Sequence, residues 1–489
     1  MKKAKKIISL ILAAVLLTSC GITCFAADGT GDKASAQQES PNLWDKVCGF
    51  FGNIADSIKA FFNKVMGFLG IRSNFTGGDY TIPEIDLSTL PEELKGTEYE
   101  YLYELYTIDD SNDYMAHPDS VLLKDGSILT VYPAGHGKGA ILNRVSTDGG
   151  ITWSGTIENT PESWINSQET PTIYRLEFSD GRDDKLILIS ANPKWPNSST
   201  TGGFECSISD DEGKTWSEFR RFYSLEDENS VVPIVAMSSL TRLKENGKFV
   251  DKWMGLFHDA DFYNYKTILT FDENGNMQWS VPEKYFAQYR ETEQATNMCE
   301  VEVIRSDMSK GDELCLITRS NAKNVNSLIS FSQDEGKTWS EPVEAPAALN
   351  GERHKAEYTP DGRLIISFRS IERGEKAKDN AKNRTDKSRG WISEGLVAWA
   401  GTYEDLKNGT EGQYRIKLAH TYVEGQTEPE YYANADTGYC GNVVLPDGTV
   451  MICSYGKFSP DKKTSDGKEL KTSICAKRLR LEDLDKLVK

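Results

Sequence analysis

The chain is short of basic residues, and its cysteines lack the spacing of a metal site. Lysine and arginine total 56 against 74 aspartates and glutamates, which gives a formal net charge of −18. Phosphate binding needs a basic surface, so this balance argues against a nucleic-acid partner. The nine cysteines match no zinc pattern, and several lie inside apolar runs. We therefore expect buried thiols, with no metal, no disulfide framework and no cofactor.

Long apolar runs are also scarce, and the single one stands at the N-terminus. Four lysines among the first six residues precede the apolar residues 7–17, a pattern typical of a signal peptide over 1–27. Cleavage is predicted either at an ordinary site ending near Ala27 or at a lipoprotein box that makes Cys20 the lipidated residue. Both predict a secreted or extracellular protein, and the second adds a lipid anchor at the cell surface. No later run is long enough to span a bilayer.

The pattern changes twice after this segment. Residues 28–42 read as a polar linker, and residues 43–72 place apolar side chains at helical spacing. We predict an amphipathic helix there, docked on protein or, through residues 43–70, in contact with a membrane surface. Over residues 80–489 short strand-like runs are separated by Asp-Gly and Asn-Gly turns, which predicts an all-β domain.

One eight-residue pattern, S-x-D-x-G-x-T-W, recurs along this domain. Complete copies start at residues 146, 209 and 332, and a degraded copy starts at 270, so the period is about 62 residues. The aspartate suits a tight turn, the glycine supplies a positive φ, and the tryptophan can pin the turn to a sheet. We expect each copy to be a peripheral hairpin without a catalytic role.

Six segments align on this period as innermost strands. They begin near residues 116, 169, 235, 297, 353 and 438, and each leads through a turn into further strands. Four strands per unit and six units predict a six-bladed β-propeller of four-stranded antiparallel blades, with residues 80–112 supplying the entry and the ring-closing strand. The starts of the inner strands meet at one end of a propeller. We therefore expect Glu169, Glu300, Arg353 and Tyr439 to converge there.

Together these features resemble the bacterial sialidases (neuraminidases) with Asp-box (BNR) repeats, over roughly residues 115–456. Residues 438–448 (GYCGNVVLPDG) resemble the family's nucleophile segment, and residues 297–302 (NMCEVE) resemble the segment of its glutamate partner. Residues 315–321 (CLITRSN) resemble the segment of one arginine in the family's carboxylate-binding triad.

The resemblance implies a role for each matching residue. Tyr439 attacks the sugar, Glu300 takes its proton, and Arg319 holds the substrate carboxylate, with retention through a covalent intermediate. A tyrosine suits this chemistry because a carboxylate nucleophile would be repelled by the acid group of sialic acid. Glu302, on the same side of the strand, is the alternative to Glu300.

The sequence departs from the family at two positions. Ala116 stands where the family has its first triad arginine, and residues 132–138 hold no aspartate where the family has its general acid. We predict His136, in a Gly-His-Gly loop, or Asp119 as the acid. Further substrate contacts are predicted from these residues: Arg369 as the third arginine (with Arg389 as the alternative), Arg353 as a replacement for the lost one, His117, Glu169 and Asp259.

Three functions are compatible with this sequence. The first is a secreted glycoside hydrolase resembling exo-α-sialidases, which cleaves terminal sialic acid or a related acidic sugar from glycans. The second is a propeller polysaccharide lyase, or a glycosidase of other specificity, that uses a histidine with Tyr439. The third is a non-catalytic glycan-binding propeller. All three predict a glycan as the partner.

Overall fold

The computed structural model describes residues 80–488 apart from several short segments. Those segments are 136–138, 154, 158, 167–168, 192–200, 291–296, 321–325, 373–391, 423–435 and 465–466. The predicted signal peptide, linker and amphipathic helix over residues 1–72 lie outside the described residues. Among the residues that are described, no helix is long and apolar enough to cross a membrane.

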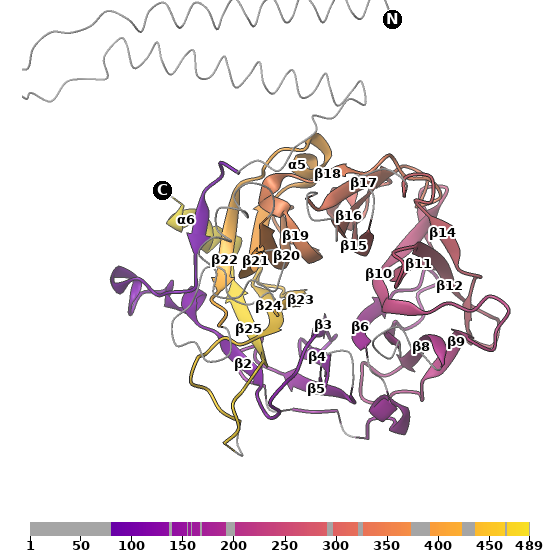
Figure 1. The fold of residues 1–489 in the computed structure, drawn as a ribbon, viewed down its shortest axis with the longest axis horizontal. Coiled ribbons are helices and arrows are strands. Elements are labelled where there is room, and N and C mark those ends of the chain that lie inside the picture. The colour runs from indigo at the N-terminus through magenta and orange to yellow at the C-terminus, as the bar shows by residue number, and fades with distance from the viewer. Residues whose placement is uncertain are drawn as a thin grey trace, which may run out of the picture. The chain divides into compact units, whose positions relative to one another are not determined.

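Six inner strands form a closed ring in which each strand contacts the next (Figure 1). They are β3 (Asp119–Leu122), β6 (Glu169–Leu176), β10 (Pro233–Glu245), β15 (Met298–Arg305), β19 (Gly351–Tyr358) and β23 (Gly438–Val444). Each begins within about three residues of its predicted start. The six-bladed β-propeller predicted from the repeat is thus confirmed.

Each blade is built outward from its inner strand by antiparallel pairing. Blade 1 adds β4 (Ile128–Pro133) and β5 (Ile141–Ser146), and a bridge from Val145 to Gly155 takes the fourth position. Blade 2 adds β7 (Lys185–Ala191), β8 (Gly202–Ser209) and β9 (Arg220–Ser224). Blade 3 adds β11 (Lys248–Asp259), β12 (Asn264–Phe271), β13 (Met277–Trp279) and β14 (Glu283–Tyr285).

The remaining blades follow the same plan. Blade 4 adds β16 (Leu314–Ser320), β17 (Leu328–Ser332) and β18 (Val343–Glu344). Blade 5 adds β20 (Leu364–Glu372), β21 (Ile392–Gly401) and β22 (Tyr414–Ala419), and blade 6 adds β24 (Val450–Gly456) and β25 (Ser473–Leu479).

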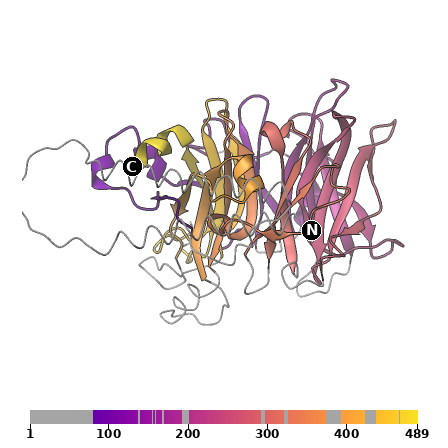
Figure 2. The same ribbon diagram turned by 90° about the horizontal axis from the view of Figure 1, so that it is seen from above.

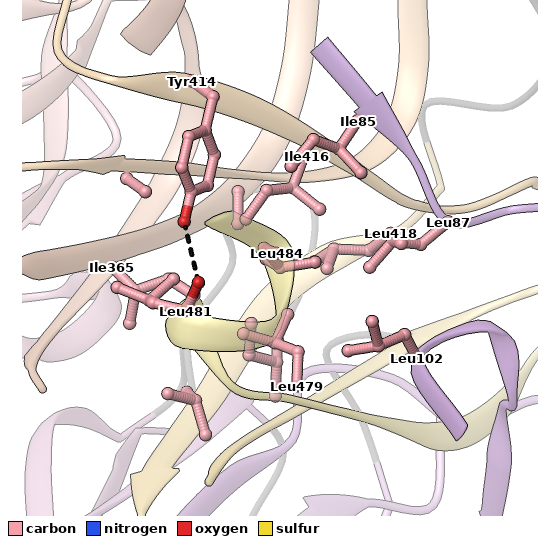
Figure 3. Close-up of a cluster of buried hydrophobic side chains, with 14 of the residues drawn as sticks. Ile85, Leu87, Leu102, Ile365, Tyr414, Ile416, Leu418, Leu479, Leu481 and Leu484 are labelled. Atoms are coloured by element: carbon pink, nitrogen blue, oxygen red, sulfur yellow. Dashed lines mark hydrogen bonds between the residues drawn. The ribbon is translucent and has the colours of Figure 1, made fainter. Parts of the chain in front are cut away.

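The N-terminal part of the domain closes the ring, as predicted. Strand β2 (Tyr106–Asp109) pairs antiparallel with β25, so blade 6 joins an N-terminal strand to the C-terminal strand of the domain. Strand β1 (Glu84–Asp86) pairs parallel with β22 at the outer edge of blade 5. Helix α6 (Leu481–Leu487) lies beside this N-terminal segment (Figure 2). Its buried Leu481 and Leu484 pack in one apolar cluster with Leu87 and Leu102 (Figure 3).

The repeated motif forms the predicted hairpin between the third and fourth positions of a blade. In the copy at 332–339, the Ser332 hydroxyl accepts from the Gly336 N–H at 2.9 Å and donates to Asp334 at 2.9 Å. Asp334 accepts from the Thr338 N–H at 2.8 Å and the Thr338 hydroxyl at 2.6 Å. The same bonds recur in the copies at 146–153 and 209–216. Each aspartate is thus fully used in holding its own turn.

A glutamate inside two of these hairpins joins neighbouring blades, which the sequence did not reveal. Glu335 accepts from both terminal nitrogens of Arg305, at 2.8 and 2.6 Å. Arg305 also donates to the Arg242 carbonyl at 2.9 Å, and the Lys244 N–H donates to Glu335 at 2.9 Å. Because Arg242 and Lys244 belong to β10, this buried ion pair links blade 4 to blade 3. Glu212 with Arg175 links blade 2 to blade 1 in the same way.

The described cysteines are the buried thiols that the sequence predicted. All six are buried, and none forms a disulfide within the described part of the chain: Cys206, Cys299, Cys315, Cys440, Cys453 and Cys475. Burial raises the pKa of Cys453 to about 12 and that of Cys440 to about 11, so these thiols are protonated at neutral pH.

Candidate active site

A recurring backbone distortion places a residue with positive φ at or just before the start of the inner strand in five blades. The register of β10, β15, β19 and β23 shifts near the start of each strand. A non-glycine residue with positive φ lies at each shift: Met237 (φ 49°), Glu300 (φ 51°), Arg353 (φ 56°) and Tyr439 (φ 51°). His117 (φ 51°), just before β3, is the blade 1 counterpart. Such residues cost about 1–3 kcal/mol each, and they cluster at functional sites.

Tyr439 and Glu300 form the centre of this cluster. The Tyr439 hydroxyl donates a hydrogen bond to Oε1 of Glu300, and both side chains are buried. Nη1 of Arg319, on β16, donates to both oxygens of Glu300, at 3.1 and 2.9 Å. The predicted trio therefore meets, and Glu300 rather than Glu302 contacts the tyrosine.

The charges around this trio set the protonation states. Burial alone would raise the pKa of Glu300, but the charge of Arg319 and the Tyr439 hydrogen bond outweigh it and hold that pKa well below its ordinary value. Burial and the charge of Glu300 raise the pKa of Tyr439 well above its ordinary value. At neutral pH the pair is a carboxylate that accepts a hydrogen bond from a neutral phenol.

Glu352 organises two of the arginines, and the sequence analysis did not select it. Its Oε1 lies 3.3 Å from Nε of Arg319, and its Oε2 accepts from Nε and Nη2 of Arg369 at 3.0 and 2.6 Å. Arg369 also donates to the Thr437 carbonyl at 3.1 Å. Glu352 is 1% exposed. The only feature of the sequence that could have identified Glu352 as a site residue is its position next to Arg353, at the start of a predicted inner strand.

A third arginine completes the surroundings of the tyrosine. Arg353 donates to the Ser238 carbonyl at 3.1 Å, and its guanidinium carbon lies 5.6 Å from the centre of the Tyr439 ring. The guanidinium carbon of Arg369 lies 5.7 Å from the same ring. These two arginines and Arg319 face the carboxylates of Glu300 and Glu352, so among these five groups the positive charges outnumber the negative ones by one.

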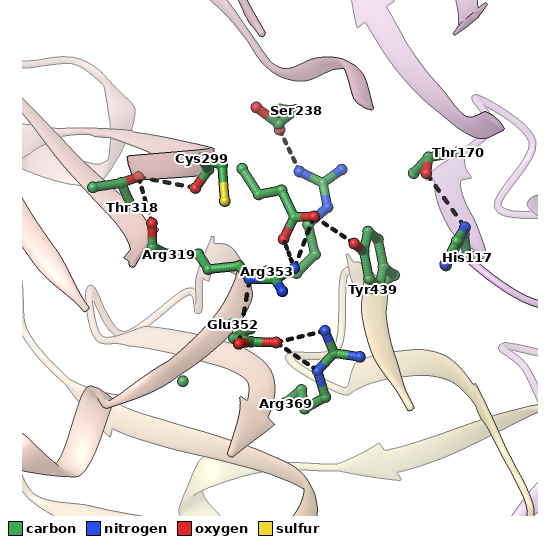
Figure 4. Close-up of polar contacts among 12 residues, drawn as sticks. His117, Thr170, Ser238, Cys299, Thr318, Arg319, Glu352, Arg353, Arg369 and Tyr439 are labelled. Carbon is green, nitrogen blue, oxygen red and sulfur yellow. Dashed lines mark hydrogen bonds and ion pairs between the residues drawn. The ribbon is translucent and has the colours of Figure 1, made fainter. Parts of the chain in front are cut away.

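His117 lies on the other side of Tyr439 (Figure 4). The two rings are 4.2 Å apart between centroids, and the imidazole also meets the Tyr455 ring edge-on at 5.3 Å. Nδ1 of His117 lies 3.3 Å from the Thr170 hydroxyl and 3.8 Å from Oε1 of Glu169. Six of the predicted residues thus share one site: Tyr439, Glu300, Arg319, Arg353, Arg369 and His117, with Glu169 behind the histidine.

Two acidic residues lie farther along the inner strands and join them. Asp119 accepts from the N–H groups of Ser120 and Ile173, each at 3.0 Å, and lies 3.7 Å from the Lys355 ammonium. Glu302 accepts from the Ala356 N–H at 3.1 Å. These bonds connect β3 to β6 and β15 to β19, so both carboxylates are used between blades. The acid role predicted for Asp119 gains no support from this geometry.

The remaining predicted residues lie elsewhere or cannot be placed. Asp259 accepts from the N–H groups of Asp261 and Tyr263, at 3.0 and 2.9 Å, and so holds the turn that follows β11. His136 and Arg389 lie outside the described residues. Within the described ranges, no group of histidine, cysteine, aspartate and glutamate is arranged to hold a metal ion. The chemical roles of all these residues stay predictions.

Comparison with known proteins agrees with the fold. The BNR repeat-like domain family matches residues 158–376, and the BNR/Asp-box repeat matches residues 144–154. No curated protein matches the chain.

The solved structures similar to this chain are distant in sequence. A Hadza microbial sialidase is 17% identical, with 78% of this chain and 69% of its own covered, at a TM-score of 0.45. The intramolecular trans-sialidase from Ruminococcus gnavus is 11% identical (78% and 98% covered, TM-score 0.46). An α-L-arabinanase from Penicillium chrysogenum is 13% identical (78% and 98%, TM-score 0.48). Over residues 158–376 this chain is thus similar to BNR repeat-like domains, and its described residues form a six-bladed propeller with a BNR/Asp-box repeat at residues 144–154.

Proposed function

We propose that this protein is a glycoside hydrolase that removes terminal sialic acid, or a closely related acidic sugar, from glycans. The observation that carries this proposal is the hydrogen bond from Tyr439 to Glu300 inside a group of three arginines. Glycosidases ordinarily use two carboxylates, and a tyrosine nucleophile is the exception found in sialidases.

The Tyr439–Glu300 pair is arranged for attack without a free phenolate. The tyrosine is neutral, and the carboxylate already accepts its hydrogen. As the phenolic oxygen bonds to the anomeric carbon, its proton passes to Glu300, which Arg319 keeps available as a base. A neutral attacking group avoids repulsion with a substrate acid on the same carbon.

The charge of the site favours an anionic sugar. Two buried carboxylates compensate two of the three arginines, and Arg353 lies against the face of the Tyr439 ring. A bound monoanion would neutralise the remaining positive charge, which is costly to keep buried alone. A neutral sugar would not. This favours sialic acid over the neutral substrates of other propeller glycosidases.

The direct test is hydrolysis of a fluorogenic 2-α-linked sialoside by the full-length protein. We expect release of the fluorophore, and loss of that release in Tyr439→Phe. A folded wild-type protein that binds sialosides but releases nothing would favour the non-catalytic glycan-binding alternative.

One observation keeps a lyase as the second candidate. The imidazole of His117 lies against Tyr439, and a histidine–tyrosine pair beside arginines also suits proton abstraction next to a uronate carboxylate. Lyase action produces an unsaturated sugar that absorbs in the ultraviolet. Activity on uronate polymers, without activity on sialosides, would support it.

A further inference from the structure

The feature that the proposed function leaves unexplained is the fixed position of His117. Its backbone has a positive φ of 51°, and the side chain is 1% exposed. The ring is held between two tyrosines, Tyr439 at 4.2 Å and Tyr455 at 5.3 Å between centroids. A strained backbone that places an imidazole against the nucleophile calls for a reason beyond packing.

Hydrogen bonds behind the ring define which nitrogen carries hydrogen. The Thr170 hydroxyl donates to Oε1 of Glu169 at 2.8 Å, which uses its single hydrogen. Toward Nδ1 of His117, 3.3 Å away, the same oxygen therefore acts as the acceptor, so Nδ1 carries a hydrogen. Glu169 is 3% exposed, and its carboxylate lies 3.8 Å from Nδ1. This arrangement orients the imidazole, and Glu169 is the carboxylate that faces it when both ring nitrogens carry hydrogen.

We propose that His117 is the general acid and base of the reaction, with Glu169 and Thr170 as positioning residues. The inference rests on the proposed glycosidase function. The nitrogen that exchanges the proton is Nε2, on the side of the ring away from Glu169. The ring centroids of His117 and Tyr439 lie 4.2 Å apart, so the acid and the nucleophile belong to one site.

The proton transfers balance over two steps. In the first, Nε2–H of cationic His117 gives its proton to the glycosidic oxygen while the bond from that oxygen to the anomeric carbon breaks. The Tyr439 oxygen bonds to the anomeric carbon and passes its proton to Glu300. In the second, neutral His117 takes a proton from water, the water oxygen bonds to the anomeric carbon, the bond to Tyr439 breaks, and Glu300 returns the proton to the phenolic oxygen.

Other groups near the site are less suited to this role. Burial lowers the pKa of His258 to about 4, despite the opposing charge of Glu300, so that imidazole is neutral at pH 7. Asp119 is held by two N–H groups and lies near Lys355. The groups that face His117 from the neighbouring strands are Glu169 on β6, Tyr439 on β23 and Tyr455 on β24.

The test uses leaving groups that differ in their need for a proton. 4-Nitrophenyl sialoside has a leaving group stable as an anion, whereas sialyllactose needs its leaving oxygen protonated. In His117→Gln we expect kcat/KM for sialyllactose to fall by about 10²–10⁴-fold. The value for the aryl sialoside should fall far less. Added azide should raise its kcat, because azide attacks the covalent intermediate without a base. Thr170→Val should show the same selective loss in weaker form.

Matched variants keep the outcomes distinct. His136→Gln tests the alternative acid, and His420→Gln, a half-buried histidine beside Ser88, should leave both substrates unaffected. Equal losses on both substrates in His117→Gln, or the selective loss appearing in His136→Gln instead, would overturn the proposal. If the wild-type protein turns over neither sialoside, it is the proposed function itself that fails.

Discussion

The hydroxyl of Tyr439 donates a hydrogen bond to Glu300, which precedes it by 139 residues and lies two blades away. Each residue occupies the distorted start of an inner strand. Blade 5 lies between them in the ring and supplies Arg353, Arg369 and Glu352 to the same site. The propeller thus brings a phenol, a carboxylate and a cationic environment together from successive blades.

Replacing Glu300 with glutamine should remove the base while preserving the hydrogen bond to Tyr439. An amide cannot take the phenolic proton during attack. We expect kcat/KM on an aryl sialoside to fall by about 10²–10⁴-fold. Steady-state kinetics, with circular dichroism as the check on folding, measures this. Glu302→Gln, which alters a carboxylate on the same strand, is the matched comparison. A larger loss of activity in Glu302→Gln than in Glu300→Gln would show that Glu302, and not Glu300, is the base.

Arg353→Gln should weaken binding of an acidic sugar. The change removes a positive charge from the site and leaves a shorter, neutral polar side chain. We expect KM for the sialoside to rise about 30-fold or more, equivalent to about 2 kcal/mol. Arg182→Gln, which removes an exposed arginine from a turn in blade 2, should leave KM unchanged. An unaltered KM in Arg353→Gln would contradict the role of this arginine in recognising an anion.

Glu335→Ala should destabilise the propeller without touching the site. The change leaves the guanidinium of Arg305, 4% exposed, without its carboxylate partner. Breaking a buried pair in this way costs about 3–5 kcal/mol. Chemical denaturation measures the loss. Glu273→Ala alters the corresponding position of the degraded repeat, where the side chain is exposed, and should cost little. Equal stabilities for the two variants would refute the inter-blade role of Glu335.

Lys477 should make stability depend on pH in the alkaline range. Burial lowers its pKa to about 7, whereas lysine in an unfolded chain titrates near 10.4. Between these values the unfolded chain binds more protons, so stability should rise with pH from about 7 to 10. Lys477→Met should lack this rise, so the stability of the wild type relative to the variant should increase between about pH 7 and 10, as followed by denaturation at several pH values. A pH-independent difference would show that Lys477 is charged in the folded state.

Much of the fold could be predicted because turns and repeats are encoded by residues that are close together in the sequence. The Asp-box pattern and the Asp-Gly turns mark where strands end, so the inner strands were located to within about three residues. Convergence of Tyr439, Glu300 and Arg319 followed from the ring and from the resemblance to sialidases. The predicted role of residues 80–112 in closing the ring was equally a consequence of the strand count.

The rest depends on contacts between blades, which leave no local pattern. Nothing around Glu352 marks it as the bridge between Arg319 and Arg369. Likewise, Glu335 and Arg305 lie 30 residues apart in blade 4, and the backbone groups of Arg242 and Lys244 that they bind belong to blade 3. The positive φ of Tyr439 and His117 could not be predicted from the sequence either, because neither residue type adopts that conformation often enough. Asp119 was predicted as a candidate acid because the sequence does not show that its carboxylate accepts from the N–H groups of Ser120 and Ile173.

The most direct measurement is the rate of fluorophore release from a 2-α-linked sialoside by the wild-type protein and by Tyr439→Phe. The account predicts turnover by the wild type and its loss in the variant, which keeps the ring but lacks the attacking oxygen. Turnover that survives in Tyr439→Phe would contradict the account.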